Sequence, residues 1–180
     1  MKKIILAAIA ALILSGCQSA GFIMPGDITV DKSEFDGVSQ IKSVPAWVYK
    51  GDGSYSNIAF GYRWVSSSPE YILIKARLTN QTVSIDSNHG LQFNIDGRIV
   101  KLSTNQTYTD FNKYTGQYSV QHSTKEFPVK LSFAQKLIDS KSVKVKMLSA
   151  DGYLDGDFKV DNSSSAIESL KNFIDKVNDF

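Results

Sequence analysis

Cysteine and histidine are scarce in this chain of 180 residues, which contains one cysteine and two histidines. A single cysteine cannot form a disulfide bond within the chain. His89 lies in a turn-rich stretch, and His122 lies at the end of a predicted strand. We expect both side chains to be solvated, and we predict neither a metal site nor another cofactor.

The chain also lacks the short motifs that accompany common catalytic mechanisms. No serine has the flanking glycines of a nucleophile elbow, no HExxH pattern is present, and no glycine-rich loop ends in GK[ST]. We therefore predict no catalytic residue. A hydrolase that uses a pair of Asp or Glu side chains remains open, because such pairs have no fixed spacing along a chain.

Long hydrophobic runs are absent apart from residues 4–14, which are eleven consecutive apolar residues after Met1, Lys2 and Lys3. A helix of this length measures about 16 Å, roughly half the thickness of a hydrocarbon core. The run is therefore too short for a transmembrane helix, and it fits the central region of a secretory signal peptide.

The apolar run ends in Leu14, Ser15, Gly16 and Cys17, an aliphatic residue and two small residues before the cysteine. This order resembles the lipobox of bacterial lipoprotein precursors. The resemblance implies cleavage of residues 1–16, lipid attachment to Cys17 and three acyl chains in the mature protein. One acyl chain binds a bilayer only marginally, whereas three would hold the protein permanently. The alternatives are an ordinary signal peptide, in which Cys17 is incidental, and an uncleaved anchor.

The residue after the cysteine bears on which membrane holds the protein. In Gram-negative lipoproteins an aspartate at this position tends to retain the protein at the inner membrane. Gln18 stands here instead, so the resemblance implies the outer membrane. The inner membrane, or the plasma membrane of a Gram-positive bacterium, is the alternative.

An excess of positive charge is absent from the expected mature chain. The sequence has 20 Lys and Arg residues and 18 Asp and Glu residues, and residues 1–16 hold two of the lysines and none of the acids. The mature balance is then zero, which argues against the basic footprint of a nucleic-acid-binding protein. The expected partners are the membrane, through the lipid, and an envelope protein, peptidoglycan or lipopolysaccharide.

The expected mature chain consists of a short tether and one domain. Residues 17–26 hold the lipidated cysteine and a tether, and residues 27–180 are long enough for one hydrophobic core. Phe22, Ile23 and Met24 interrupt the tether. We expect them to dock on the domain, with the membrane interface as the alternative.

The domain is dominated by the alternating pattern of β-strands. Apolar residues alternate in 58–64 and 72–78, and residues 91–102 form a predicted hairpin around Asp96-Gly97, which favours a two-residue turn. This turn pairs Phe93 with Val100 and Leu91 with Leu102. Further strands are expected at 117–122, 143–148 and 153–160.

Apolar residues at three- and four-residue spacing predict two helices. A short helix near 132–140 has Ser132 and Gln135 at the spacing of a capping box, and an amphipathic helix near 165–179 has Ser165 and Glu168 at that spacing. The predicted fold is mainly β within the α+β class. It is an antiparallel sheet, sandwich-like or strongly curled, which the C-terminal helix covers.

Two sets of side chains are candidates for contact with a ligand or partner. Trp47, Tyr62 and Trp64 could stack on a glycan, although rings at alternating strand positions also fill sheet cores. Lys144 and Lys146 share one face of a strand and could contact an anionic surface. The alternative for the lysines is an edge strand that they protect from mispairing.

Acidic residues gather between Asp151 and Asp161 and invite comparison with a calcium loop. An EF-hand loop that starts at Asp155 needs glycine at its sixth position for its sharp turn, and the segment has Val160 there. We interpret these carboxylates as solvated turn residues.

Taken together, the sequence favours a lipid-anchored, non-catalytic envelope protein that binds another envelope component or supports its assembly. The alternatives are a cell-wall or lipid hydrolase that uses Asp and Glu pairs, and a glycan-binding module that uses Trp and Tyr faces.

Replacing the cysteine tests the interpretation of the N-terminus. We expect Cys17→Ala to abolish incorporation of a palmitate analogue, because acylation requires the thiol, and to move the protein from the detergent phase to the aqueous phase on phase separation. Ser15→Ala keeps a small residue in the lipobox and serves as the control. Palmitate incorporation by Cys17→Ala would contradict the interpretation.

Overall fold

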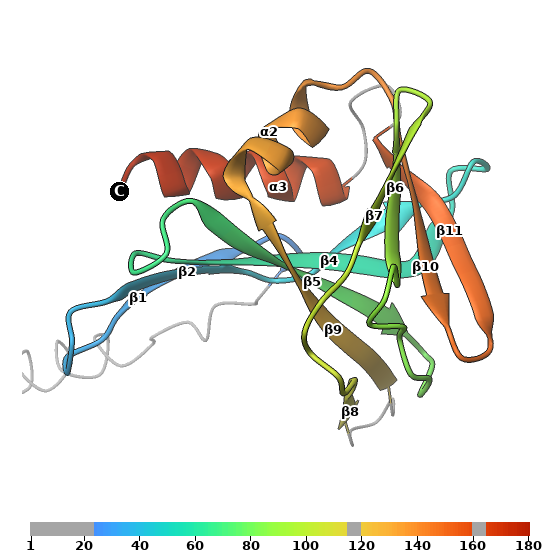
Figure 1. The fold of residues 1–180 in the computed structure, drawn as a ribbon, viewed down its shortest axis with the longest axis horizontal. Coiled ribbons are helices and arrows are strands. Elements are labelled where there is room, and N and C mark those ends of the chain that lie inside the picture. The colour runs from blue at the N-terminus through green and yellow to red at the C-terminus, as the bar shows by residue number, and fades with distance from the viewer. Residues whose placement is uncertain (1–23, 115–119, 160–164) are drawn as a thin grey trace, which may run out of the picture.

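The structure is a computed structural model that describes residues 24–114, 120–159 and 165–180. Within these residues the chain forms eleven strands and two helices (Figure 1). The expected lipidation site Cys17, with Phe22 and Ile23 of the tether, lies outside the described residues. The elements are β1 Ile28–Lys32, β2 Ser39–Ser43, β3 Ala46–Tyr49, β4 Tyr55–Val65, β5 Tyr71–Thr79, β6 Leu91–Ile95, β7 Arg98–Leu102, β8 Asp110–Tyr114, β9 Val120–Lys130, α2 Leu131–Asp139, β10 Val143–Ser149, β11 Gly152–Lys159 and α3 Ser165–Asn178.

All of these strands belong to one antiparallel sheet, in the order β7-β6-β10-β11-β3-β4-β5-β9-β8, with β2 pairing with β1 and β4. The sheet curls like half a barrel. In Figure 1, β6, β7, β10 and β11 stand steeply against the part that contains β2, β4 and β5, and both helices lie within the curve. The predicted mainly β fold is confirmed, in its strongly curled form.

The long strand β4 organises the sheet. It pairs with β5 along one edge, while β3 and β2 share its other edge, β3 against Tyr55–Phe60 and β2 against Arg63–Val65. The chain between β2 and β3 bends at Pro45 and passes close to Gly61. A Cβ at Gly61 would lie 3.0 Å from the carbonyl oxygen of Ser43, which is tighter than normal packing. Glycine at this position therefore allows two short strands to follow one long strand.

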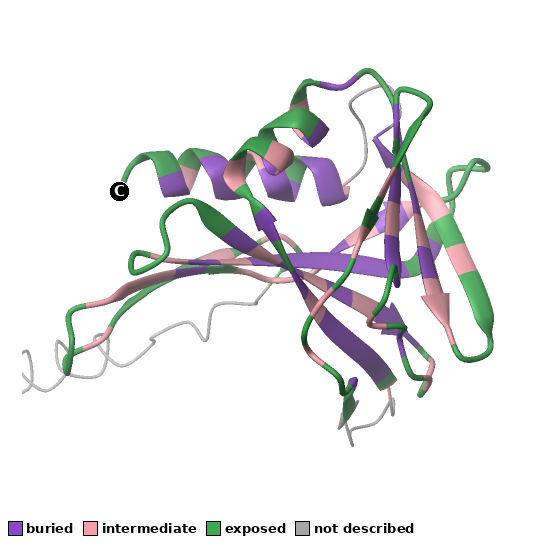
Figure 2. Ribbon diagram, in the orientation of Figure 1, coloured by how far each residue is buried: buried purple, intermediate pink, exposed green. Residues whose placement is uncertain are grey.

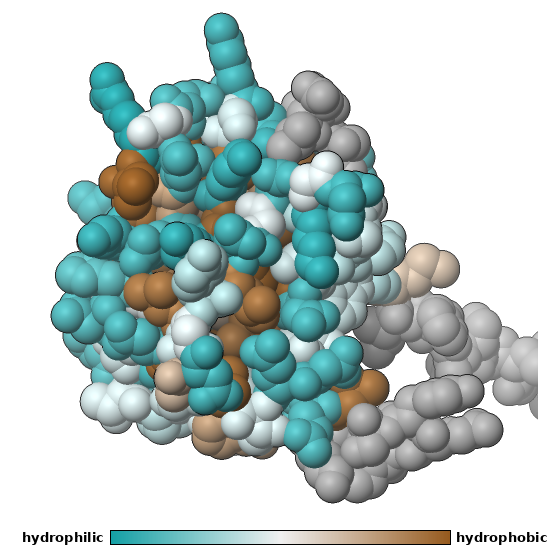
Figure 3. Space-filling model, turned by 90° about the vertical axis from the view of Figure 1, so that its right-hand side faces the viewer, coloured by the Kyte–Doolittle hydropathy of each residue, from teal (hydrophilic) through white to brown (hydrophobic). Residues whose placement is uncertain are grey.

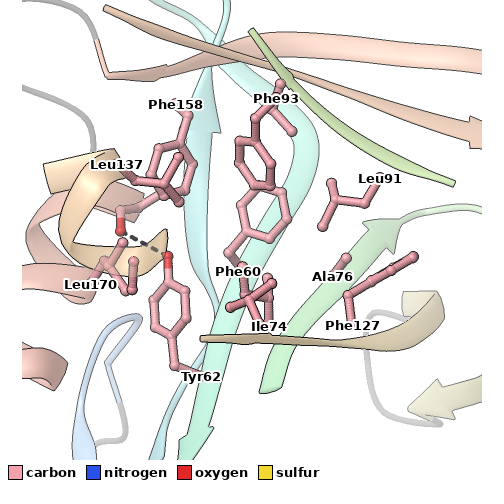
Figure 4. Packing of buried hydrophobic residues seen from close by; sticks show 14 of the residues in the cluster. Phe60, Tyr62, Ile74, Ala76, Leu91, Phe93, Phe127, Leu137, Phe158 and Leu170 are labelled. Atoms are coloured by element: carbon pink, nitrogen blue, oxygen red, sulfur yellow. Dashed lines mark hydrogen bonds between the residues drawn. The ribbon is translucent and has the colours of Figure 1, made fainter. Parts of the chain in front are cut away.

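The inner face of the curl contains the hydrophobic core. The ring of Phe60 lies 6.0 Å from that of Phe93 and 5.5 Å from that of Phe158, a distance at which aromatic rings attract each other (Figure 4). The buried segments of Figure 2 run along the sheet and the sides of the helices that face it. Burial of this apolar surface is the main favourable term for folding.

Helix α3 covers the core as predicted, and its apolar stripe is buried, namely Ala166, Ile167, Leu170, Phe173, Ile174 and Val177. The capping predictions are wrong. Lys130 is the N-cap residue of α2 and makes no side-chain capping bond, so Ser132 lies inside the helix. Ser165 begins the described part of α3, and its hydroxyl donates to the carbonyl of Trp47 at 2.7 Å instead. Contact with the sheet thus replaces local capping.

The predicted β6–β7 hairpin is confirmed in full register, with Phe93 opposite Val100 and Leu91 opposite Leu102. The Asp96 and Gly97 backbones have φ angles of 49° and 88°, as the two-residue turn requires. The strands at 143–148 and 153–160 also pair, as β10 and β11, although Val160 lies outside the described residues. Local turn chemistry at Asp96-Gly97 therefore determines the β6–β7 hairpin.

Strand β9 is longer than predicted and continues through Pro128 to Lys130. The backbone N–H of Glu126 donates to the side-chain oxygen of Gln106 at 2.9 Å, so it points away from β5. Pro128 is two residues farther along and faces the same way, where its missing N–H costs no bond to β5. Residues 117–119 of the predicted strand lie outside the described residues.

Strands β1 and β2 form a hairpin arm, residues 28–43, that extends from the sheet (Figure 1). Lys42 and Asp31 pair across it at 3.4 Å. The chain enters the arm at Gly26, whose N–H donates to the carbonyl of Val44 at 3.0 Å. The side chain of Met24 is exposed, so the predicted docking of this residue on the domain is wrong.

A buried lysine holds the segment 80–90 against the open end of the curl. Lys125 lies on the inner face of β9, and its ammonium donates to the carbonyl of Ile85 at 2.6 Å and to the hydroxyl of Ser87 at 2.7 Å. Ile85 also bridges to Ser149 of β10. Burial lowers the pKa of Lys125, and the carboxylate of Asp86 opposes this effect. The segment thus links β9 to β10 and closes the core.

Removing this ammonium tests its role in the core. We expect Lys125→Ala to lower the free energy of unfolding by about 2–4 kcal/mol, because it leaves a cavity and leaves the buried carbonyl of Ile85 with only the long bond from Thr109 at 3.5 Å. Urea denaturation measures the change. Lys130→Ala removes an exposed lysine of the same strand and is the control; equal stabilities of the two variants would contradict the proposed role.

Candidate functional site

The register of β6, β10 and β11 places polar side chains in rows on the outer face of the sheet. Val145 and Met147 of β10 point into the core, so Lys144 and Lys146 point outward. Lys144 pairs with Asn94 of β6 and Asp157 of β11. Residues directly opposite each other share a face, which makes Asn94, Lys144 and Asp157 one polar row.

A second row runs beside the first. Lys146 pairs with Gln92 of β6 and with Asp155 of β11. Its ammonium lies 4.3 Å above the ring of Tyr153, close enough for attraction between a cation and the ring. Gly156 lies between the two aspartates and faces inward, where a Cβ would lie 2.7 Å from the side chain of Val48. The core beneath β11 therefore requires glycine here.

These rows form the floor and walls of a groove of about 430 Å³. Lys50 and Gly51, from the turn between β3 and β4, line it on one side, and Ile99 of β7 lines it on the other. We call this surface the outer groove. Figure 3 shows the side of the molecule on which its strands lie, where hydrophilic side chains surround smaller hydrophobic patches.

Charges of both signs lie side by side in the outer groove, with the lysines on β10 and the aspartates on β11. The ammonium of Lys144 lies 4.0 Å from the carboxylate of Asp157, and the side chain of Lys144 remains largely exposed. The side chain of Asp157 is only 15% exposed, so the lysine is the more accessible partner of the pair. The arrangement places hydrogen-bond donors and acceptors side by side in the groove.

Aromatic side chains continue the first row beyond β11. Tyr49 of β3 pairs with Asp157, and its ring stacks on that of Tyr55 with centroids 5.0 Å apart. The ring of Trp47 meets Tyr55 edge-on at 6.4 Å. We call Trp47, Tyr49 and Tyr55 the aromatic row. It borders the outer groove, since Asp157 belongs to the groove lining.

The structure places the predicted ligand residues in different environments. Lys144 and Lys146 both lie in the outer groove, and β10 is an interior strand between β6 and β11, so the edge-strand alternative is wrong. Trp47 is half-buried in the aromatic row.

Tyr62 and Trp64 are core residues, which corrects their assignment to a glycan surface. Only 2% of Tyr62 and 6% of Trp64 is exposed. The hydroxyl of Tyr62 donates to the carbonyl of Ala166 in α3, the dashed line of Figure 4, and the indole N–H of Trp64 donates to the carbonyl of Pro69. Burial also raises the pKa of Tyr62. Neither ring offers a face to a sugar.

The groove residues Gln92 and Asn94, and Tyr153 beside Lys146 at the border of the groove, were not identified from the sequence. The sequence does indicate that these side chains point outward, because each alternates with apolar residues that would point into a sheet core. It does not indicate the order of the strands, which places β10 between β6 and β11 and so brings the side chains together.

Asp155 and Asp157 line the outer groove rather than a turn, which corrects their assignment as turn residues, and Asp161 lies outside the described residues. Among the residues that the structure describes, no group of three or more His, Cys, Asp or Glu side chains is arranged to hold a metal ion.

The two histidines occupy unlike environments. His89 is exposed in a turn with a φ angle of 68°. His122 pairs with Thr79 and Asn112 inside the sheet and is only 7% exposed, so the expectation of a solvated side chain is wrong for this residue. Burial lowers the pKa of His122, and the nearby charge of Arg77 lowers it further.

Comparison with known proteins concerns the N-terminus alone. Residues 1–18 match the family model of the prokaryotic membrane lipoprotein lipid attachment site. The chain therefore carries a lipoprotein signal. The match supports a lipid-anchored membrane lipoprotein, in agreement with the resemblance of residues 14–17 to a lipobox.

No curated protein and no solved structure matches this lipoprotein. In the part of the lipoprotein that the structure describes, neither helix is long and apolar enough to cross a membrane.

The buried histidine predicts a pH dependence of stability. Because the pKa of His122 is lowered on folding, the unfolded chain takes up the proton first as the pH falls through about 6.5, and stability is lost down to the lowered pKa. We expect the stability of the wild type relative to His122→Gln to fall as the pH decreases from about 7.5 through about 6.5, the ordinary pKa of histidine.

Urea denaturation across this range measures the difference, and His89→Gln serves as the control for loss of an exposed histidine. A stability difference between wild type and His122→Gln that does not change with pH would contradict the prediction.

Proposed function

We propose that this lipoprotein is a non-catalytic component of the bacterial envelope and that its β domain binds another envelope component through the outer groove. The observation that carries the proposal is the pair of polar rows built by β6, β10 and β11. Backbone pairing holds these side chains in a fixed pattern, and preorganised groups lose less freedom when a ligand binds.

The lipid anchor keeps this groove close to a membrane. Attachment through Cys17 confines the domain to the neighbourhood of one membrane, where a ligand fixed in the same envelope meets it at high effective concentration. We place the protein in the outer membrane, because Gln18 stands where inner-membrane lipoproteins tend to have aspartate.

The arrangement of the groove acids favours binding over hydrolysis. Glycosidases place two carboxyl groups on opposite sides of the bond that they cleave. Asp155 and Asp157 stand two residues apart on one strand, so they approach a ligand from the same side, and Asp157 lies beside the ammonium of Lys144. This geometry suits recognition of a ligand by hydrogen bonds and charge.

A charge exchange tests the groove without removing its ion pair. We expect the double variant Lys144→Asp, Asp157→Lys to reduce recovery of the bound envelope component by about fivefold or more, because it reverses the charge pattern that the ligand meets. The measurement is a pull-down of the lipidated, tagged protein from detergent-solubilised envelopes, with proteins, muropeptides and lipopolysaccharide quantified.

The matched control is Lys42→Asp, Asp31→Lys, which exchanges the ion pair of the hairpin arm. Cys17→Ala separates binding by the domain from tethering by the lipid. Equal recovery with the groove exchange and the arm exchange would count against the proposal.

A further inference from the structure

The outer groove presents the two kinds of polar group that a sugar requires. Each hydroxyl of a sugar both donates and accepts hydrogen bonds, so it is best met by donors and acceptors placed side by side. Asp155 and Asp157 supply acceptors, Lys144 and Lys146 supply donors, and Asn94 supplies both. The two adjacent rows each place an amide, a lysine and an aspartate in the same order, which repeats this combination over the groove.

Exposed tyrosines flank these polar groups. Tyr153 precedes Asp155 by two residues on β11 and is 61% exposed, and Tyr55 of the aromatic row is 60% exposed. A pyranose ring has an apolar C–H face that stacks on such rings, and the tyrosine hydroxyls can bond to the hydroxyls at the edge of the sugar. Groove and tyrosines share the outer face, so one saccharide chain can contact both.

The net charge of the groove favours acidic saccharides over neutral ones. Its lining contains Lys50, Lys144 and Lys146 against Asp155 and Asp157, an excess of one positive charge. The exposed Lys101 of β7 is paired with Gln92 and adds a further positive charge at the border of the second row, while Asp52, near Lys50 in the β3–β4 turn, adds a negative one at the other side. Complementary charge increases both the rate and the specificity of association.

We propose that the outer groove and the aromatic row form a binding site for an acidic saccharide, one that carries carboxylate or phosphate groups on its sugars or on a peptide attached to them. This proposal rests on the proposed function and names the ligand class of the same groove. Two envelope sources supply this chemistry, the peptide-bearing sugars of peptidoglycan and the phosphorylated core sugars of lipopolysaccharide.

Isothermal titration of the lipidated protein in detergent micelles tests the inference. The probes are a peptidoglycan disaccharide tetrapeptide, a deacylated lipopolysaccharide core oligosaccharide and a neutral oligomer of N-acetylglucosamine. We expect one acidic probe to bind at least about tenfold more tightly than the neutral oligomer, and the acidic probe that binds identifies the source.

Variants locate the site. Tyr153→Ala and Lys146→Gln should each weaken binding of the acidic probe by about tenfold, since one removes the stacking ring and the other a positive donor. Tyr108→Ala is the matched control, because Tyr108 is 63% exposed and lies just before β8, at the end of the strand order opposite to β6, β10 and β11. Circular dichroism confirms that each variant is folded.

Three results would overturn the inference. Binding that is equal in Tyr153→Ala and Tyr108→Ala would place the saccharide elsewhere, and a preference for the neutral oligomer would refute the acidic class. No binding of any saccharide, while the groove charge exchange still reduces recovery of an envelope protein, would refute the saccharide and leave the proposed function standing. The proposed function itself fails if that exchange has no effect on any recovered component.

Discussion

Burial of one face of a single curled sheet is the constraint on which the rest of the structure depends. The aromatic and aliphatic residues of β4, β5, β6 and β10 point to the inside of the curl, and the fold is stable only if this apolar surface is buried. Helices α2 and α3 cover part of this surface. The segment 80–90 covers another part, and the ammonium of Lys125 holds it in place at the cost of burying a charged group. With the inner face filled, the outward rows over β10 and β11 remain free for contact with a ligand.

The outer groove follows from the same register that builds the core. Alternation along a strand sends Val145 inward and Lys144 and Lys146 outward, and antiparallel pairing aligns these lysines with amides on one side and aspartates on the other. The side chains that would meet a ligand are thus fixed by backbone hydrogen bonds. The outer groove is therefore rigid and open to solvent. These properties suit recognition of a ligand near the membrane to which the lipid confines the domain.

Much of the local structure could be predicted from the sequence, because short-range rules control it. Asp96-Gly97 favours one turn type, and the apolar pattern on either side permits one register, so every pair of the β6–β7 hairpin was predictable. The apolar stripe of α3 was equally clear. The capping pairs at Ser132 and Ser165 misled because local spacing says nothing about tertiary partners. Contact with Trp47 decided the role of Ser165.

The candidate site was predicted only in part, because its parts come from strands that are distant in sequence. The outward pairing of Lys144 and Lys146 follows from alternation, but their amide and aspartate neighbours depend on strand order. Alternation also groups Tyr62 and Trp64 without telling which face is buried. The burial of His122 and Lys125 had no local signal, since each depends on what packs against the sheet from elsewhere.

Site-specific photo-crosslinking in living cells tests most directly whether the outer groove is the binding surface. A photoreactive amino acid replaces Ile99, which lines the outer groove, or Tyr108, which does not, and the two residues are 64% and 63% exposed. We expect the probe at Ile99 to crosslink to an envelope component, whereas the probe at Tyr108 gives little or no product. Equal crosslinking from both positions, or crosslinking from Tyr108 alone, would contradict the assignment of the outer groove as the binding surface.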